Sequence, residues 1–312
     1  MNLNPRNQEK LFGYDNLFKH FINLFTDKKF PNKILISGPK GIGKSTFAYH
    51  FINYIFSINE PNSYNFDNHK ILSNNRSFNL IKKLSHPNFH LIDILDGKKI
   101  IEISQIRNAI SYSQKSSFDN NYRIVLIDNI EFLNLYSTNA LLKIIEEPNE
   151  KLLFILIHNN TKKIIKTIKS RCIVFNKQFT YNENLTIAND LANYDLKDHF
   201  SSSIINHYFT IGDFLYLYNF SITNKIDIKN KSLKELILYL INFKIYKNNQ
   251  DLTNLIYKLI ESYFHYSFLN NKNLYIYRLY QYFINKINYT NKFNLDIESL
   301  FLEFKNKIAI NE

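Results

Sequence analysis

Cysteine, glycine, proline and tryptophan are all scarce in this chain. Its 312 residues include one cysteine (Cys172), six glycines, six prolines and no tryptophan. A single cysteine excludes an internal disulfide and a cysteine-rich zinc site, and such usage is typical of a reducing cytoplasm. The longest apolar run, Leu152–Ile157, is far shorter than the roughly 20 residues that span a bilayer. We therefore expect a cytoplasmic protein with no membrane segment.

Acidic residues are outnumbered by basic ones. The chain has 39 Lys and Arg against 27 Asp and Glu, which gives a net charge of +12 and a pI near 9.4. Such a balance favours a polyanionic partner, above all nucleic acid. Only six of the basic residues are Arg, however, and the abundance of Asn, Ile, Tyr and Lys is typical of an AT-rich genome. The charge is thus open to two interpretations, a nucleic-acid surface or compositional drift.

The first 175 residues alternate short apolar segments with amphipathic ones, the pattern of an α/β domain with a mostly parallel sheet. The polar, Asn-rich residues 57–79 predict a surface excursion with little regular structure. We expect strands over Lys33–Ser37, Phe89–Asp93, Arg123–Asp128, Leu153–Ile157 and Cys172–Phe175, and helices over Thr46–Phe56, Ile103–Ser113 and Ser137–Glu147.

The strand pattern ends near residue 176. Short helical segments are expected over 182–220, and a polar stretch follows around Thr223–Lys231. Apolar residues then recur at helical spacing in four segments, which predicts four packed amphipathic helices: Leu233–Ile241, Leu252–Ile260, Ile276–Ile287 and Ile297–Ile308. We expect three domains, at 1–176, 177–228 and 229–312, of which the last two are α-helical.

One motif carries a specific chemistry. Residues 38–45 match the pattern G-x-x-x-x-G-K-S, between an expected strand and an expected helix. Its backbone N–H groups suit phosphate oxygens, Lys44 suits the β- and γ-phosphates, and the Ser45 hydroxyl suits Mg²⁺. We therefore predict ATP and Mg²⁺ binding; the alternative is a relic loop with a filled pocket. The candidate nucleotide-binding residues are Gly38, Pro39, Lys40, Gly41, Ile42, Gly43, Lys44, Ser45 and Thr46.

The acid that completes such a site follows a second buried strand. Asp128 ends the run Ile124-Val-Leu-Ile-Asp128, where it can hold Mg²⁺ through water opposite Ser45. Hydrolysis also needs a carboxylate that activates the attacking water, but the next residue is Asn129, which cannot accept the proton. Glu131 is near, and two residues further on we expect it to point elsewhere. The sequence thus predicts nucleotide binding with little hydrolysis.

Further motifs resemble a known family. Ile103-Ser-Gln-Ile-Arg107, Asn139-Ala-Leu-Leu-Lys143 with Glu146-Glu-Pro148, and Ser170-Arg171-Cys172 occur in the order and spacing of bacterial clamp-loader subunits of the AAA+ class. The resemblance covers residues 5–175. It implies an AAA+ P-loop NTPase domain with a mostly parallel sheet, followed by a small helical lid domain and an α-helical collar domain that forms oligomers.

Within this family the chain resembles the delta-prime type of DNA polymerase III subunit more than the ATP-hydrolysing tau/gamma type. The run Gln105-Ile-Arg107, the missing second acid and the short tail favour that choice. The stretch Thr210–Leu215 also offers no Arg where motor subunits usually have a sensor arginine. The resemblance implies a hetero-oligomeric complex with tau/gamma and delta subunits, a sliding clamp and primed DNA as partners.

The resemblance assigns roles to two more residues. Arg171 matches an arginine finger that acts in trans on the ATP of a neighbouring subunit, and the alternative is a salt bridge at a strand edge. Asn159 matches a sensor of the γ-phosphate, and the alternative is a local hydrogen bond. The four zinc-binding cysteines of many family members are absent, so we expect no zinc. Cys172 is then a small buried apolar residue.

A basic run precedes Arg171 and leaves a further possibility open. On a helix, Lys162, Lys166 and Lys169 would share a face and could contact a DNA backbone, although a solvated face is the commoner case. Three functions are therefore compared: a non-motor clamp-loader subunit, an ATPase motor of the tau/gamma or small replication-factor type, and a nucleotide-gated DNA-binding module. The pairing of an intact phosphate loop with Asn129 favours the first.

Overall fold

The computed structural model describes residues 3–115, 121–146, 151–205, 208–247 and 249–309. The chain divides into two compact units. One comprises Met1–Ile187 with Thr210–Gly212, and the other comprises Ala188–Phe209 with Asp213–Glu312. Within the described ranges, every helix is too short or too polar to serve as a membrane span.

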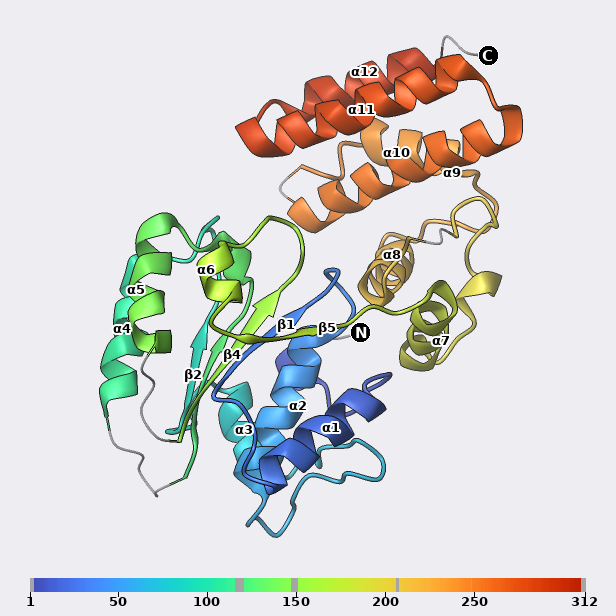
Figure 1. Ribbon diagram of the computed structural model, residues 1–312. Coiled ribbons are helices and arrows are strands. Elements are labelled where there is room, and N and C mark those ends of the chain that lie inside the picture. Colours follow the sequence, from blue (N-terminus) through green and yellow to red (C-terminus); the bar gives the residue numbers. More distant parts are fainter. Residues whose placement is uncertain (1–2, 116–120, 147–150, 206–207, 248, 310–312) are drawn as a thin grey trace. The chain divides into compact units, whose positions relative to one another are not determined.

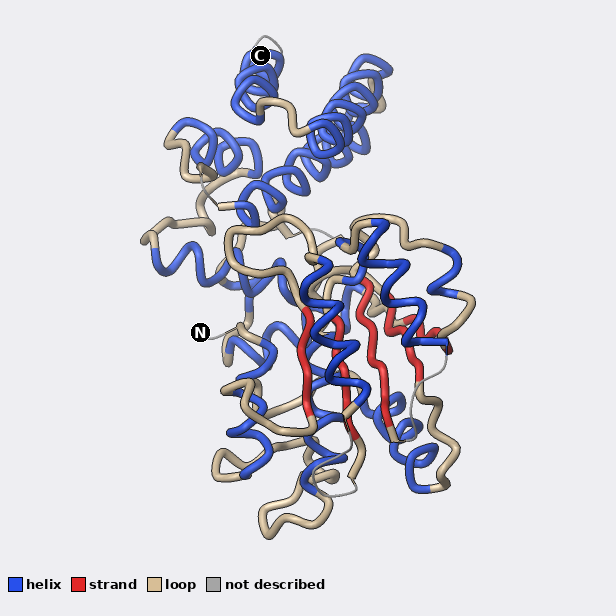
Figure 2. The backbone as a smooth tube through the Cα atoms, turned by 90° about the vertical axis from the view of Figure 1, so that its left-hand side faces the viewer, coloured by secondary structure: helices blue, strands red, loops and turns tan. Residues whose placement is uncertain are grey.

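The first unit is built on one parallel sheet (Figures 1 and 2). Its five strands lie in the order β2-β3-β4-β1-β5. Its strands are nearly continuous runs of Ile, Leu and Val, as expected where both faces of a sheet are covered. Because all strands are parallel, their carboxyl ends meet at one edge. The strands are β1 (Lys33–Ser37), β2 (Phe89–Ile92), β3 (Arg123–Ile127), β4 (Leu152–His158) and β5 (Ile173–Asn176).

Helices cover both faces of this sheet (Figure 1). On one face lie α4 (Ile103–Gln114), α5 (Leu135–Glu146) and α6 (Lys166–Lys169), whose buried side chains share a core with β1, β3 and β4. On the other lie α1 (Asp15–Thr26), α2 (Lys44–Ser57) and α3 (Arg76–Lys82). There the rings of Phe21 and Phe47 meet with their centroids 5.0 Å apart. Helix α1 thus packs against the first turn of α2.

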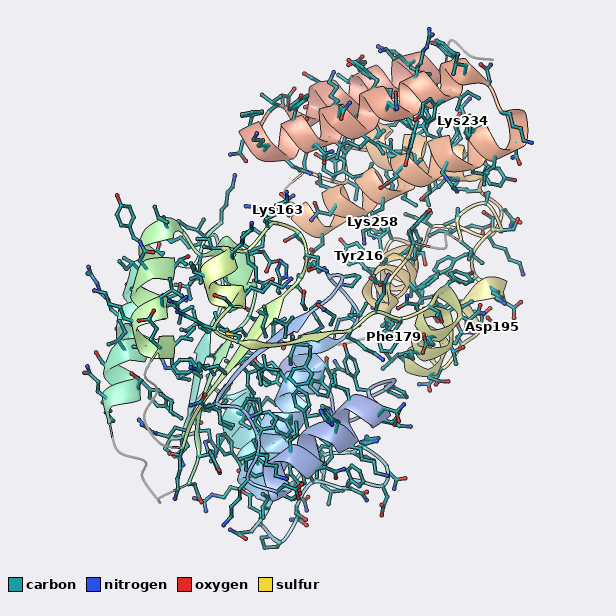
Figure 3. All side chains as sticks on the ribbon, in the orientation of Figure 1. Lys163, Phe179, Asp195, Tyr216, Lys234 and Lys258 are labelled. Carbon is teal, nitrogen blue, oxygen red and sulfur yellow. The ribbon has the colours of Figure 1, made fainter. Side chains whose placement is uncertain are left out.

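The second unit is helical. It contains most of α8 (Ile211–Thr223), then α9 (Leu233–Asn242), α10 (Gln250–Asn271), α11 (Leu274–Phe293) and α12 (Ile297–Ala309). Two contacts tie α8 to the start and middle of α10: Lys258 pairs with Asp213 at 2.5 Å, and the Tyr216 hydroxyl donates to Asn249 at 3.0 Å (Figure 3). The helix α7 (Tyr181–Ala192) lies across the division between the units.

Most of the expected elements are confirmed. The five strands and the four carboxy-terminal helices occur where the sequence predicts them, within one or two residues for the strands. The helix expected to reach Glu147 extends to Glu146, and Glu147 lies outside the described residues. The irregular stretch predicted over 57–79 is wrong at its end, because Asn75 caps α3 with a 2.6 Å bond from the Phe78 N–H. Helix α1 was not predicted.

Candidate functional site

The phosphate loop joins β1 to α2. Gly41 and Gly43 have φ values of 89° and 84°, in the left-handed region that favours glycine. The Lys44 ammonium is buried and donates to the carbonyl oxygens of Gly38 at 2.9 Å and Pro39 at 2.6 Å. Burial lowers the pKa of Lys44 to about 8. The amino end of α2 thus presents free backbone N–H groups with a cation beside them, an arrangement suited to phosphate.

Two other segments of the first unit hold this loop. The Gly212 N–H donates to the Gly41 carbonyl at 2.8 Å, and a Cβ added to Gly212 would lie only 2.9 Å from the Gly41 Cα. The hydroxyl of the buried Tyr14 donates to the Ile42 carbonyl at 3.0 Å. Sequence reasoning missed both supports. The sequence did offer one signal: Gly212 comes directly before a helix with an apolar face, and a glycine there permits another backbone segment to approach closely.

Asp128 lies opposite the loop, at the carboxyl end of β3. The Ser45 hydroxyl donates to its carboxylate at 2.6 Å. Burial raises the pKa of Asp128 to about 6; the nearby Asp93 carboxylate adds to this, while the bond from Ser45 opposes it. A hydroxyl and a carboxylate are oxygen ligands of the kind that Mg²⁺ prefers. These two residues therefore fit an Mg²⁺ ion that arrives with a nucleotide.

The position after Asp128 carries an amide. Asn129 adopts a left-handed conformation with φ 56°, which Asn tolerates better than most residues. Glu131, the other acid nearby in sequence, is buried and already bonded. Its carboxylate accepts from the Asn159 N–H at 3.2 and 3.3 Å and from the Thr161 hydroxyl at 2.7 Å. The side chain of Glu131 thus braces the loop after β4.

Asn159 lies next to Asn129 at the same edge of the sheet. Its side-chain Nδ2 donates to the side-chain Oδ1 of Asn129 at 2.8 Å, and the side-chain Nδ2 of Asn129 donates to the Asp93 carboxylate at 2.8 Å. Asp93 follows β2 directly and was missed as a site residue. The signal was available, since acids that follow neighbouring parallel strands come together at the carboxyl edge.

Arg171 lies between α6 and β5. Its guanidinium pairs with Glu146 at 2.7 Å and donates to the Thr167 carbonyl at 3.1 Å. About a third of the Arg171 side chain and half of that of Glu146 are exposed to solvent. Arg171 therefore sits at the surface, held by its own chain in a pair that solvent can reach.

The basic run differs from expectation. Only Lys166 and Lys169 lie on the short helix α6, while Lys162 and Lys163 belong to the preceding segment. The Lys162 ammonium lies 4.5 Å from the centroid of the Phe132 ring. The predicted helical face of Lys162, Lys166 and Lys169 is thus wrong.

Two further observations concern metals and thiols. Over the described ranges of the chain, no three His, Cys, Asp or Glu residues gather as metal ligands. Cys172 is half-buried and packs against the core to which α5 and α6 contribute, so its predicted burial is confirmed only in part. Burial raises the pKa of its thiol to about 11, which favours the protonated form at neutral pH.

The strand order, the phosphate loop after β1 and the acid after β3 define an AAA+ P-loop domain. A family model described as "DNA polymerase III, delta subunit" matches residues 13–179, more than half of the chain. The chain therefore belongs to this family of DNA polymerase III clamp-loader subunits.

Individual relatives include both types of subunit. DNA polymerase III subunit delta' of Buchnera aphidicola subsp. Schizaphis graminum is 31% identical over 158 residues, 51% of this chain and 46% of that protein. Subunit gamma of the same organism is 30% identical over 181 residues, 58% of this chain and 47% of that protein. The chain thus aligns with about half the length of these relatives. A gamma subunit-related protein of Thermotoga maritima is similar in structure, with a TM-score of 0.44 and 14% identity, over 91% of this chain and 96% of that one.

Proposed function

We propose that this chain is a delta-prime-type, non-motor subunit of a DNA polymerase III clamp loader, which binds ATP and hydrolyses little of it. One observation supports this above all. An intact phosphate loop faces Asp128, but the next residue is the amide Asn129, and the carboxylate of Glu131 is engaged by Asn159 and Thr161. The site has the groups that hold a nucleotide and lacks a free carboxylate at the usual place for activating water.

Different residues of the site bind different parts of Mg·ATP. The backbone of Gly38, Pro39, Lys40, Gly41, Ile42, Gly43 and Thr46 surrounds the phosphates. Lys44 leaves the two loop carbonyls and pairs with the β- and γ-phosphates. Ser45 and Asp128 hold Mg²⁺, which when bound neutralises phosphate charge. Asn159 senses the γ-phosphate.

In this proposal Arg171 acts on a neighbouring subunit. Its planar cation leaves Glu146 and stabilises the charge on a phosphoryl group being transferred in the neighbour's site. The partners are tau/gamma and delta subunits, joined through the helices α9 to α12, together with a sliding clamp and primed DNA in the cytoplasm. The three-domain division at 176 and 228 belongs to the same proposal, with 177–228 as the lid and 229–312 as the collar.

The test uses the purified full chain. We expect saturable binding of Mg·ATP that Lys44→Ala abolishes, and phosphate release near the background measured with Lys44→Ala. An exposed lysine in the same unit, Lys163→Ala, is the matched control and retains binding. Turnover well above background would contradict the non-motor proposal, and absence of ATP binding would contradict the nucleotide role.

A second candidate, an ATP-hydrolysing motor of the tau/gamma type, has a specific observation in its favour. The gamma relative is 30% identical to this chain, a value close to the 31% of the delta' relative. In addition, Asp93 places a second carboxylate close enough to raise the pKa of Asp128. If Asp93 serves as the base, the purified chain hydrolyses ATP and Asp93→Asn removes that activity while Asp96→Asn, on the same loop, leaves it intact.

A further inference from the structure

Three side chains form a continuous chain of hydrogen bonds along the carboxyl edge of the sheet. Asn159 follows β4, Asn129 follows β3 and Asp93 follows β2, so the three strands deliver them in spatial order. The side-chain Nδ2 of Asn159 donates to Oδ1 of Asn129 at 2.8 Å, and the side-chain Nδ2 of Asn129 donates to Asp93 Oδ1 at 2.8 Å. Each residue thus depends on the next for its orientation.

The donor-to-acceptor direction of this series of hydrogen bonds is fixed at the Asp93 end. Asp93 Oδ1 also accepts the backbone N–H of Ile94 at 2.7 Å, so this oxygen is an acceptor. Its other neighbour must therefore be a donor, which places the Asn129 nitrogen toward Asp93 and the Asn129 oxygen toward Asn159. The Asn159 nitrogen must in turn face Asn129. Side-chain amides can otherwise flip by 180° at little cost, so the carboxylate decides both orientations.

The second N–H of Asn159 is the part that matters for a nucleotide. An amide nitrogen carries two hydrogens, and Asn129 accepts only one of them. A phosphate oxygen can accept the other, whereas a flipped Asn159 would present its oxygen and repel the phosphate. The Asn159 backbone is itself anchored, since its N–H donates to the Glu131 carboxylate. Only the side-chain orientation is left for Asp93 to decide.

We propose that Asp93 is a positioning residue that orients the Asn129 and Asn159 amides, so that Asn159 offers an N–H to the γ-phosphate and the site distinguishes ATP from ADP. This inference rests on the proposed nucleotide-binding function. Asp93 contacts no phosphate in this scheme, and acts through the two asparagines.

The experiment measures dissociation constants of the full chain for ADP and for a non-hydrolysable ATP analogue, both with Mg²⁺. The Asp93→Leu variant keeps the approximate shape of the side chain but removes the acceptor, so that nothing holds the Asn129 amide in one orientation; an Asn at this position would keep an oxygen beside the Ile94 N–H and go on accepting from Asn129. The preference for the ATP analogue over ADP is expected to fall about tenfold, the value of one hydrogen bond to a charged group. Removing a negative charge near phosphate would by itself strengthen that preference, so the expected change has the opposite sign to a simple charge effect.

Two further variants sharpen the result. Asp96→Leu makes the same substitution at an exposed position of the same loop and leaves the preference unchanged. The double variant Asp93→Leu with Asn129→Asp places an acceptor-only carboxylate directly beside Asn159, and is expected to restore the preference.

Each other outcome overturns a defined part of the proposal. An unchanged or increased preference in Asp93→Leu shows that Asp93 does not orient Asn159. A fall that the double variant fails to reverse shows that Asp93 acts by another route. Failure of the unaltered chain to bind either nucleotide overturns the proposed function together with this inference, whereas the first two outcomes leave nucleotide binding intact.

Discussion

Arg171 and Glu146 form an ion pair in which one carboxylate oxygen receives two guanidinium nitrogens, Nε at 2.9 Å and Nη2 at 2.7 Å. The pair joins the last residue of α5 to the segment between α6 and β5. Because solvent reaches both side chains, the pair is weak compared with a buried one. Arg171 can therefore exchange Glu146 for another anion at small cost, which its proposed role in trans requires.

We expect Arg171→Ala to change the free energy of unfolding by less than about 1 kcal/mol, the usual range for a solvent-exposed ion pair. Urea denaturation of the purified chain measures this, with Glu146→Ala as the matched partner variant. A loss of several kcal/mol would mean that Arg171 is a structural residue, and would contradict its proposed role in trans.

Gly212→Ala is expected to weaken both the fold and nucleotide binding. The added methyl group would lie 2.9 Å from the Gly41 Cα, and backbone on both sides cannot move away freely. We expect a loss of roughly 1–3 kcal/mol of stability, the usual cost of overpacking, and weaker binding of ATP because Gly41 is displaced. Denaturation and ATP titration measure the two effects.

Gly97→Ala provides the control for that variant. Gly97 has a φ of 74° but open space around its Cβ position. Alanine there strains only its own backbone, at about 1 kcal/mol, and leaves ATP binding unchanged. Equal ATP affinity in the two variants would show that the Gly41–Gly212 contact does not shape the phosphate loop.

The pH dependence of stability reports on Asp128. Its pKa is raised from 3.8 to about 6 by burial, so in the nucleotide-free chain the folded state binds a proton that the unfolded state releases between these values. The stabilisation is complete below pH 4 and is lost as the pH rises through 6. Relative to Asp128→Asn, the unaltered chain is expected to gain up to about 3 kcal/mol between pH 7 and pH 4. Urea denaturation at several pH values measures this, and a difference that is flat or reversed would contradict the burial of an ionisable Asp128.

Asn129→Glu is expected to increase ATP turnover by the purified chain at least tenfold, because it supplies a carboxylate that can activate water. Asn129→Gln is the matched control, since both long side chains suffer similar strain at a φ of 56°. Phosphate release under saturating Mg·ATP measures the effect. Equal turnover by the two variants would show that the missing acid is not what limits hydrolysis.

The parts of the fold that depend on local sequence could be predicted. The phosphate loop carries its own glycines, and β1, β3 and β4 are runs of apolar residues too short for helices. The carboxy-terminal helices follow from apolar residues at helical spacing. Helix α3 was missed because its capping residue, Asn75, lies in a stretch that reads as a polar loop.

The relationships between distant residues could not be predicted in the same way. Asp93 reaches Asn129 only because β2 pairs with β3, and Gly212 reaches Gly41 across 171 positions of sequence. The resemblance indicated Arg171 but not its partner Glu146, since an exposed ion pair between distant residues produces no periodic pattern in the sequence. The bonds that Glu131 accepts from Asn159 and Thr161 join residues about 30 positions apart, and they too required the structure.

The central claim is that this chain contributes to ATP hydrolysis through Arg171 and not through its own phosphate loop. It is tested most directly by steady-state ATPase measurements on a reconstituted clamp-loader complex that contains Arg171→Ala, Lys44→Ala or the unaltered chain. The account predicts a large loss of activity with Arg171→Ala, while that variant alone still binds ATP, and a small effect of Lys44→Ala on activity. Full activity with Arg171→Ala, together with loss of activity in Lys44→Ala, would contradict it.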